Sequence, residues 1–270
     1  MEYHVDLELN GKTAIVTGGS RGFGKAIARQ LALEGVDVAI VARTLAPLEA
    51  AAAELTAETG RRIIAIAVDT GDDESVKAMV QQAAASLGNL DILVNCAAAA
   101  GGSGPAPKLA EINDTNFFSD INVKVLGYIR CAREVAPYMK AQGWGRIVSI
   151  GGMAARTTGS PITSIRNVAV VAMTKNLADE LGSFGINVTA VHPGMTRTEA
   201  VTARWAQQAE RDGISVADIE RRVADGTSVH QVIDARDIAN VVAFLASPKS
   251  LAISGDVIGA AGGLPRVIHY

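Results

Sequence analysis

Short apolar runs rich in β-branched residues alternate with longer alanine-rich stretches along most of this chain, and no other feature restricts its possible folds as strongly. Strands are expected at residues 13–17, 37–42, 62–68, 91–95, 146–150, 186–191 and 256–259. Helices are expected at residues 24–34, 45–58, 74–87, 113–141, 162–184 and 236–246. Repeated strand–helix–strand units form parallel sheets whose strands are apolar throughout, because helices cover both faces. We therefore predict an α/β fold, a doubly wound domain with a mostly or fully parallel seven-stranded sheet.

Bulk composition limits the partners of the chain. Its 270 residues fit a single domain over residues 1–270, and a net charge of −3 with a pI near 5.8 lacks the basic excess that nucleic acids attract. The apolar runs are too short to cross a bilayer, and the first residues show no export signal. We expect a cytoplasmic protein with a small-molecule substrate, no nucleic acid partner and no membrane partner.

Cysteine and histidine spacing does not indicate a metal site. Cys96 follows a predicted strand and Cys131 lies on a predicted helix, which fits a reducing compartment without disulfides. The histidines, His4, His192, His230 and His269, form no spacing typical of metal ligands. We expect no bound metal.

A glycine-rich stretch, residues 17–24 (TGGSRGFG), joins the first predicted strand to the first predicted helix. In this position glycines permit a tight turn and close backbone approach, and the helix N-terminus attracts the pyrophosphate of a dinucleotide. A glycine turn without a ligand is the alternative, because the triplet alone is a weak signal. The strand–turn–helix context favours a Rossmann-type dinucleotide site.

Several further segments occur in the order and spacing of one family. Asp69 follows the third predicted strand, residues 91–98 (DILVNCAA) stand where that family has its NNAG motif, and residues 192–198 (HPGMTRT) match its Pro-Gly turn. Over residues 9–263 the chain therefore resembles the short-chain dehydrogenase/reductase family. The resemblance implies cofactor contacts from Gly18, Ser20, Arg21, Gly22, Phe23, Gly24, Arg43, Asp69, Thr70, Asn95, Ala97, Asn167, Pro193, Gly194, Thr196 and Thr198.

The residue after the second predicted strand bears on which dinucleotide is bound. An NAD site places a carboxylate there for the ribose hydroxyls, whereas the 2′-phosphate of NADP needs cations. This chain has Ala42 followed by Arg43, and Arg21 adds a second cation from the glycine loop. The alternative for Arg43 is an exposed residue that opens a helix. We expect NADP(H) rather than NAD(H).

The proton-transfer residues of the family are missing in this chain. The run MTKNLA at residues 173–178 sets a register that places Thr163 at the family's Tyr position, Asn167 at its Lys position and Gly152 at its Ser position. Of the four family residues only the Asn, at Asn122, remains, and it could instead be a structural helix residue. Among the catalytic candidates we also retain His192, because free histidine titrates near neutrality, although this residue can simply be packed beside the Pro-Gly turn.

Three functions remain open at this stage. The first is an NADP(H)-dependent oxidoreductase with an unusual acid, such as water held by Asn122 and Thr163, acting on a small carbonyl or alcohol. The others are a non-redox lyase, dehydratase or isomerase, and a catalytically inactive nucleotide-binding protein. We favour the oxidoreductase. We also expect a substrate lid at residues 196–230 and a homodimer or homotetramer that meets through the helices at residues 113–141 and 162–184.

Overall fold

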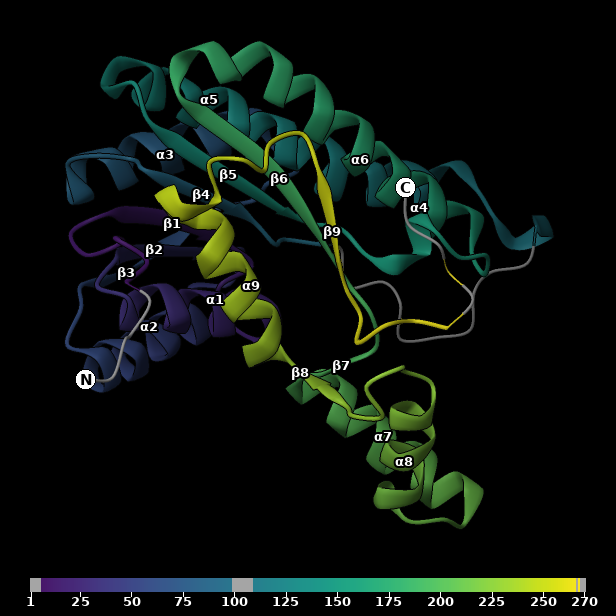
Figure 1. Ribbon diagram of the computed structural model, residues 1–270. Coiled ribbons are helices and arrows are strands. Elements are labelled where there is room, and N and C mark those ends of the chain that lie inside the picture. Colours follow the sequence, from purple (N-terminus) through teal and green to yellow (C-terminus); the bar gives the residue numbers. More distant parts are fainter. Residues whose placement is uncertain (1–5, 99–108, 266, 268–270) are drawn as a thin grey trace.

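Seven parallel strands form one sheet in a computed structural model that describes residues 6–98, 109–265 and 267 (Figure 1). The strands are β1 (Thr13–Thr17), β2 (Asp37–Ala42), β3 (Ile63–Ala67), β4 (Ile92–Asn95), β5 (Gly145–Ile150), β6 (Ile186–Pro193) and β9 (Val257–Ala260). Their order is β3-β2-β1-β4-β5-β6-β9, and every neighbouring pair is parallel. The predicted doubly wound α/β domain with a seven-stranded parallel sheet is confirmed.

Helices cover both faces of the sheet (Figure 1). On one face lie α1 (Gly22–Leu33), α2 (Leu45–Thr59) and α9 (Ala235–Ala246), whose apolar residues share one buried cluster with the strands. On the other face lie α3 (Asp73–Leu87), α5 (Gly127–Gln142) and α6 (Pro161–Leu181), which share a second cluster. Because each strand is covered on both sides, β1, β5 and β6 are buried along their whole length.

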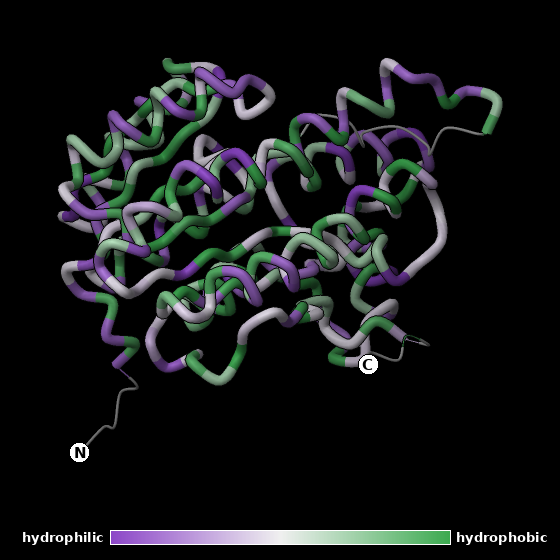
Figure 2. Tube along the Cα trace, turned by 90° about the horizontal axis from the view of Figure 1, so that it is seen from above, coloured by the Kyte–Doolittle hydropathy of each residue, from purple (hydrophilic) through white to green (hydrophobic). Residues whose placement is uncertain are grey.

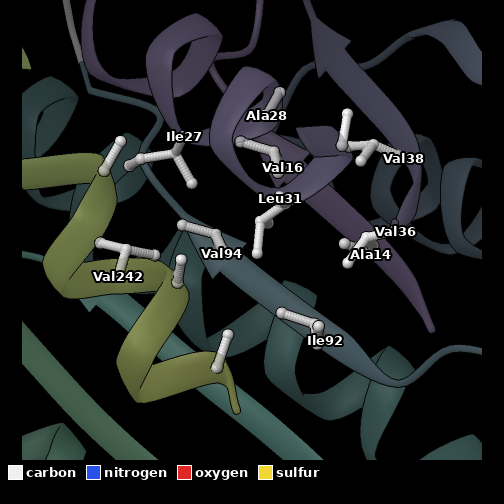
Figure 3. Close-up of a cluster of buried hydrophobic side chains, with 14 of the residues drawn as sticks. Ala14, Val16, Ile27, Ala28, Leu31, Val36, Val38, Ile92, Val94 and Val242 are labelled. Carbon is white, nitrogen blue, oxygen red and sulfur yellow. The ribbon is translucent and has the colours of Figure 1, made fainter. Parts of the chain in front are cut away.

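The packing of α1 and α9 shows how the core forms. Ile27 and Leu31 of α1 are four residues apart, so they share one face of the helix, and they meet Val94 of β4 and Val242 of α9 (Figure 3). All four side chains are fully buried, and burial of each one stabilises the fold by about 1.5–3 kcal/mol.

Seen from above, the outer helices alternate hydrophilic and hydrophobic stretches along their length (Figure 2). Within the described residues, no helix is both long and apolar enough to cross a bilayer.

The helix predicted over residues 113–141 differs in detail from the observed one. It consists of α4 (Asp114–Ile121), a π-helical segment (Asn122–Leu126) and α5, which follow one another without a break. Apolar periodicity does not distinguish a π-helical turn from α-helix, so the sequence pattern did not reveal it. Such wide turns often occur at functional sites, and this one begins at Asn122.

Residues 196–230, here called the lid segment, contain two helices that the sequence pattern did not predict. They are α7 (Glu199–Asp212) and α8 (Val216–Asp225), which extend away from the sheet in Figure 1. Val201, Trp205 and Ile219 form a small core of their own between these helices. A two-stranded parallel sheet, β7 (Thr196–Arg197) with β8 (Ile233–Asp234), anchors the segment at its base. The mostly polar composition concealed these helices because each buries only a narrow edge.

Candidate functional site

A groove of about 800 Å³ lies at the carboxyl ends of the first strands. The strand order reverses there, since β1 stands between β2 and β4, and doubly wound sheets bind ligands at such a switch point. The lining residues are Gly18, Ser20, Arg21, Gly22, Phe23, Gly24, Val41, Ala42, Arg43, Thr44, Pro47, Val68, Thr70, Cys96, Ala97, Ala98, Val123, Thr198, Glu199, Ala200, Val201 and Arg204. The groove is therefore bounded by the glycine loop, the ends of β2, β3 and β4, and the start of α7.

The glycine loop follows β1 and cannot accept a larger residue at Gly24, where it runs into α1. A Cβ on Gly24 would lie 2.2 Å from the carbonyl oxygen of Gly18, and both Gly18 and Gly22 have positive φ angles of 69° and 56°. The Thr17 hydroxyl accepts hydrogen bonds from the backbone N–H groups of Cys96 and Ala97, at 2.8 and 2.9 Å. These contacts hold the ends of β1 and β4 together, so that α1 begins at the floor of the groove.

The structure separates the predicted cofactor residues into two groups. Gly18, Ser20, Arg21, Gly22, Phe23, Gly24, Arg43, Thr70, Ala97 and Thr198 line the groove. The others are not among the lining residues: Asp69, Asn95, Asn167, Pro193, Gly194 and Thr196. Asp69 accepts a hydrogen bond from the N–H of Gly71, and the fully buried Asn95 donates one to Ser149 over 3.5 Å. Thr196 is buried and donates to the Gly194 carbonyl. The stretch of residues 101–107, rich in glycine and proline, also predicts a wall of the substrate pocket, and it falls outside the described residues.

Three arginines line the groove. Arg21 and Arg43 are exposed at its edge, and Arg204 of α7, which sequence reasoning did not select, lines it from the lid segment. Glu199 is the carboxylate among the lining residues. Its Oε2 accepts a hydrogen bond from the backbone N–H of Gly22 over 3.1 Å. Cationic side chains thus approach the groove from the sheet side and from the lid side.

The residues that the sequence register assigns to the family's catalytic positions lie together beyond the end of β5. A Cβ on Gly152 would lie 3.4 Å from Nδ2 and 3.5 Å from Oδ1 of Asn167. Asn167 is buried, its Nδ2 donates to the Thr163 carbonyl over 2.9 Å, and its Oδ1 has no partner among the described residues. Thr163 is half-buried one turn earlier on α6. The fold therefore brings the three predicted positions side by side. The Oδ1 atom of Asn167 is a buried hydrogen-bond acceptor that is available to a ligand.

Asn122 is held in a structural contact. Its Nδ2 donates to the Gly71 carbonyl over 3.0 Å, and its own backbone carbonyl accepts from Arg130 over 3.2 Å. These bonds connect the π-helical segment to the loop after β3. The geometry therefore corresponds to the structural alternative for Asn122, with its amide donor bound to the backbone.

Lys124 is a buried cation near these positions that sequence reasoning missed. Its Nζ donates a hydrogen bond over 3.1 Å to the carbonyl of Gly151, the residue before Gly152. Burial, reinforced by the positive charge of Arg166, lowers the pKa of Lys124 from 10.5 to about 8. The available signal was a lysine two residues after Asn122 inside the apolar run of residues 121–126.

Arg166 and His192 both have contacts within the chain: Arg166 is half-buried on α6, and His192 packs against Gly151. Its position one residue before Asn167 turns Arg166 to another side of the helix and predicts that it faces a partner subunit, but it forms an ion pair with Asp120 of α4 in the same chain. His192 is fully buried at the end of β6, and its ring is so close to Gly151 that a Cβ there would lie 2.4 Å from Nε2. No cluster of three or more potential metal ligands occurs within the described part of the chain.

Comparison with known proteins identifies the class to which this fold and groove belong. Residues 12–209 match the short chain dehydrogenase family. The short-chain reductase protein NovJ of Streptomyces niveus is 33% identical over 253 residues, 93% of each chain, and the 7alpha-hydroxysteroid dehydrogenase of Escherichia coli is 30% identical over 260 residues, 96% of each. This chain belongs to the short-chain dehydrogenase family, as its motifs indicated.

Solved structures agree with this assignment. The crystal structure of L-sorbose reductase from Gluconobacter frateurii, complexed with NADPH and L-sorbose, superposes with a TM-score of 0.91 at 29% identity, covering 98% of this chain and 100% of the other. A structure of 7 alpha-hydroxysteroid dehydrogenase complexed with NADH has a TM-score of 0.84 at 28% identity, covering 98% of each chain. The loss of the Ser, Tyr and Lys at Gly152, Thr163 and Asn167 stays a prediction from the register.

Proposed function

We propose that this protein is an NADP(H)-dependent oxidoreductase that interconverts the carbonyl and alcohol forms of a small molecule without the family's tyrosine acid. The observation that carries the proposal is the groove at the switch point, where Gly24 must be glycine and α1 begins against the lining. The relatives named as a reductase, a hydroxysteroid dehydrogenase and a sorbose reductase support the same reaction class.

The described residues fit a dinucleotide. The glycine loop and the N-terminus of α1 suit a pyrophosphate. The buried Oδ1 of Asn167 is an acceptor for a ribose hydroxyl, and a buried acceptor without a donor destabilises the fold by about 1–3 kcal/mol. When bound, the nicotinamide supplies or accepts the hydride. The protein contributes the positions of the reactants and the route of the proton.

Preference for NADP(H) follows from the charges at the mouth of the groove. Arg21 and Arg43 line it beside Ala42, where an NAD site would carry a carboxylate. Relatives alone do not decide the matter, since the sorbose reductase structure contains NADPH and the hydroxysteroid dehydrogenase structure contains NADH. The assignment to NADP(H) therefore depends on the arginines of this chain.

Proton transfer needs a different arrangement from the family's. An aliphatic hydroxyl is far too weak an acid to replace a phenol, so we assign Thr163 the orientation of the substrate oxygen and water the donation of the proton. Lys124 places a positive charge beside the carbonyl of Gly151, the residue before Gly152. This charge stabilises the negative charge that develops on the substrate oxygen. Asn122 contributes by fixing the π-helical segment that carries Lys124.

A second candidate is a nucleotide-binding protein without catalysis, which the residues Gly152, Thr163 and Asn167 favour. A non-redox lyase, dehydratase or isomerase would use the same cleft. Calorimetric titration with NADPH, followed by a turnover screen on carbonyl and alcohol panels, separates the three functions. Binding with turnover supports the oxidoreductase, tight binding without turnover supports the inactive protein, and no binding supports the non-redox enzyme.

Assembly and placement complete the proposal. We propose a cytoplasmic homodimer or homotetramer with a small-molecule substrate, and a substrate lid formed by the lid segment. Apolar side chains are exposed on adjacent helices: Phe118 on α4, Leu126 at the end of the π-helical segment, Ile129 on α5, and Ile165 and Val168 on α6. Self-association through this face would remove these side chains from water.

A further inference from the structure

Glu199 is the first residue of α7 and reaches across to the glycine loop, 177 residues earlier in the chain. Its Oε2 accepts the backbone N–H of Gly22, which is the first residue of α1. The first N–H groups of a helix have no partner within the helix, and together with the helix dipole they attract an anion. In this molecule the anion on the Gly22 N–H is a side chain of the lid segment.

We propose that Glu199 sets the affinity for the cofactor, because its carboxylate binds a backbone N–H that the dinucleotide's pyrophosphate also requires. Binding of the dinucleotide then exchanges one anion for another at Gly22 and releases the start of α7 from the glycine loop. This inference rests on the proposed function, since it needs a dinucleotide in the groove. It adds a residue outside the glycine loop that opposes binding.

The surroundings of the contact support an exchange of this kind. Gly22, Thr198 and Glu199 line the cofactor groove and also a second hollow of about 970 Å³ between α1 and α7. Glu199 therefore stands between two open spaces rather than in a packed core, and its side chain is exposed. A carboxylate so placed can leave Gly22 without opening a cavity in the protein.

The lid segment has the internal contacts to move as one unit. Val201, Trp205 and Ile219 pack α7 against α8, and Arg197 forms ion pairs with Glu220 of α8 and Asp234 of β8. These contacts lie on the lid side of Glu199 and do not involve the glycine loop. Loss of the Glu199 contact therefore leaves the lid core intact.

The same helix also carries a cation that faces the groove. Arg204 lies five residues after Glu199 and lines the groove with Arg21 and Arg43. A phosphate that replaces the Glu199 carboxylate therefore meets positive charge from α7 as well as the α1 N-terminus. The lid segment thus opposes binding through Glu199 and favours it through Arg204.

Substitution of Glu199 tests the exchange directly. Glu199→Gln keeps the size of the side chain and removes its charge, while Glu199→Ala removes the acceptor as well. Calorimetry with NADPH should give dissociation constants about three- to tenfold lower for both variants than for the wild-type chain, the fold-change expected for one exposed charge-assisted contact. Glu210→Gln, an equal charge change at an exposed position of the same helix, should leave the NADPH dissociation constant unchanged.

A second measurement follows the lid segment itself. Hydrogen–deuterium exchange over residues 199–212 should be faster in Glu199→Ala than in the wild-type chain, and NADPH should accelerate it in the wild-type chain but change it less in the variant. If wild type and both variants bind NADPH with equal affinity and have the same melting temperature, the proposed role of Glu199 is wrong, while the proposed function still stands. Absence of NADPH and NADH binding to every protein would overturn the proposed function and this inference with it.

Discussion

The ammonium of Lys124 donates a hydrogen bond to the carbonyl of Gly151 over 3.1 Å inside the protein, directly after the end of β5. A buried lysine is destabilising in its charged form, and here the pKa of Lys124 falls from 10.5 to about 8. The difference corresponds to about 3 kcal/mol between the two protonation states. Stability must therefore depend on pH through this residue.

The first prediction is that the unfolding free energy of the wild-type chain rises with pH relative to that of Lys124→Met. Below about pH 8 both states of wild type bind the proton and the full burial penalty applies; between about pH 8 and 10.5 only the unfolded state binds it, so the stability of wild type rises with pH. Relative to Lys124→Met, wild type should gain about 2 kcal/mol between about pH 7 and about pH 10 in urea denaturation.

Loss of the hydrogen bond to Gly151 shifts the unfolding free energy of Lys124→Met by an amount that does not depend on pH. It therefore does not alter the direction of the change with pH. Lys140→Met, at a lysine on α5 outside this buried layer, serves as the control and should follow wild type across the same pH range. A gap between wild type and Lys124→Met that stays constant with pH would show that Lys124 titrates normally in the folded protein.

The second prediction concerns the choice of dinucleotide. Arg43→Asp should weaken NADPH binding at least tenfold and leave NADH nearly unchanged, because a carboxylate beside Ala42 repels a 2′-phosphate and accepts from ribose hydroxyls. Charge-assisted contacts of about 1.5–3 kcal/mol are at stake before desolvation. Calorimetry with both cofactors measures the ratio. Arg222→Asp, an exposed position on α8, is the matched control, and tighter NADH than NADPH binding in wild type would refute the assignment.

The strands could be predicted from sequence, whereas the contacts that shape the site could not. The ends of each predicted strand lie within two residues of the observed ends. Buried parallel strands have a continuous apolar pattern, which can be recognised from neighbouring residues alone. The contact of Glu199 with Gly22 joins residues 177 apart, and no local pattern encodes it. Lys124 was missed because its role depends on Gly151, which reaches it only through the fold.

The position of Gly152 beside Asn167 lies between these extremes. The spacing from the MTKNLA run placed both residues in the family register, and the structure brings them within contact of one another. Arg166 shows the limit of the same reasoning. Its place one residue before Asn167 predicts a contact with another subunit, but its partner, Asp120, lies on a helix of the same chain.

The third prediction concerns self-association through α4, α5 and α6. Val168 is 50% exposed on α6 and lies three residues from Ile165, which is 48% exposed, so both share one apolar face. Light scattering should give wild type a mass of two or four chains of 28.0 kDa, and Val168→Glu should shift it towards one chain. Leu33→Glu on α1 changes a residue of equal exposure, 49%, on the opposite face of the sheet and should leave the mass unchanged. A wild-type mass of one chain would contradict the proposed assembly.

The fourth prediction tests together the three positions that the register assigns to the family's Ser, Tyr and Lys. Gly152→Ser, Thr163→Tyr and Asn167→Lys should place a phenol with a cation-lowered pKa beside the nicotinamide site, and a positioned acid contributes about 10²- to 10⁴-fold to the rate. The triple variant should therefore reduce activated ketones that the wild-type chain turns over slowly. A Cβ on Gly152 would make ordinary van der Waals contact with the Asn167 side chain at 3.4 Å, whereas the larger side chains at positions 163 and 167 should overpack the site and reduce stability by about 1–3 kcal/mol.

The new lysine also enters a region that already holds a cation. Lys124 binds the Gly151 carbonyl, so Asn167→Lys brings a second ammonium near it and should lower the pKa of Lys124 further. A variant with Gly152→Ser, Asn167→Lys and Thr163→Phe reproduces the packing and the charge without the phenol, so the difference between Tyr and Phe isolates the acid. Thr163→Tyr alone should gain less, because phenol and lysine act as a unit. Both triple variants are first compared by melting curve and NADPH titration. If both fold and bind NADPH, yet Tyr is no faster than Phe across the ketone panel, then Thr163 does not occupy the tyrosine position or the cleft serves a reaction other than carbonyl reduction.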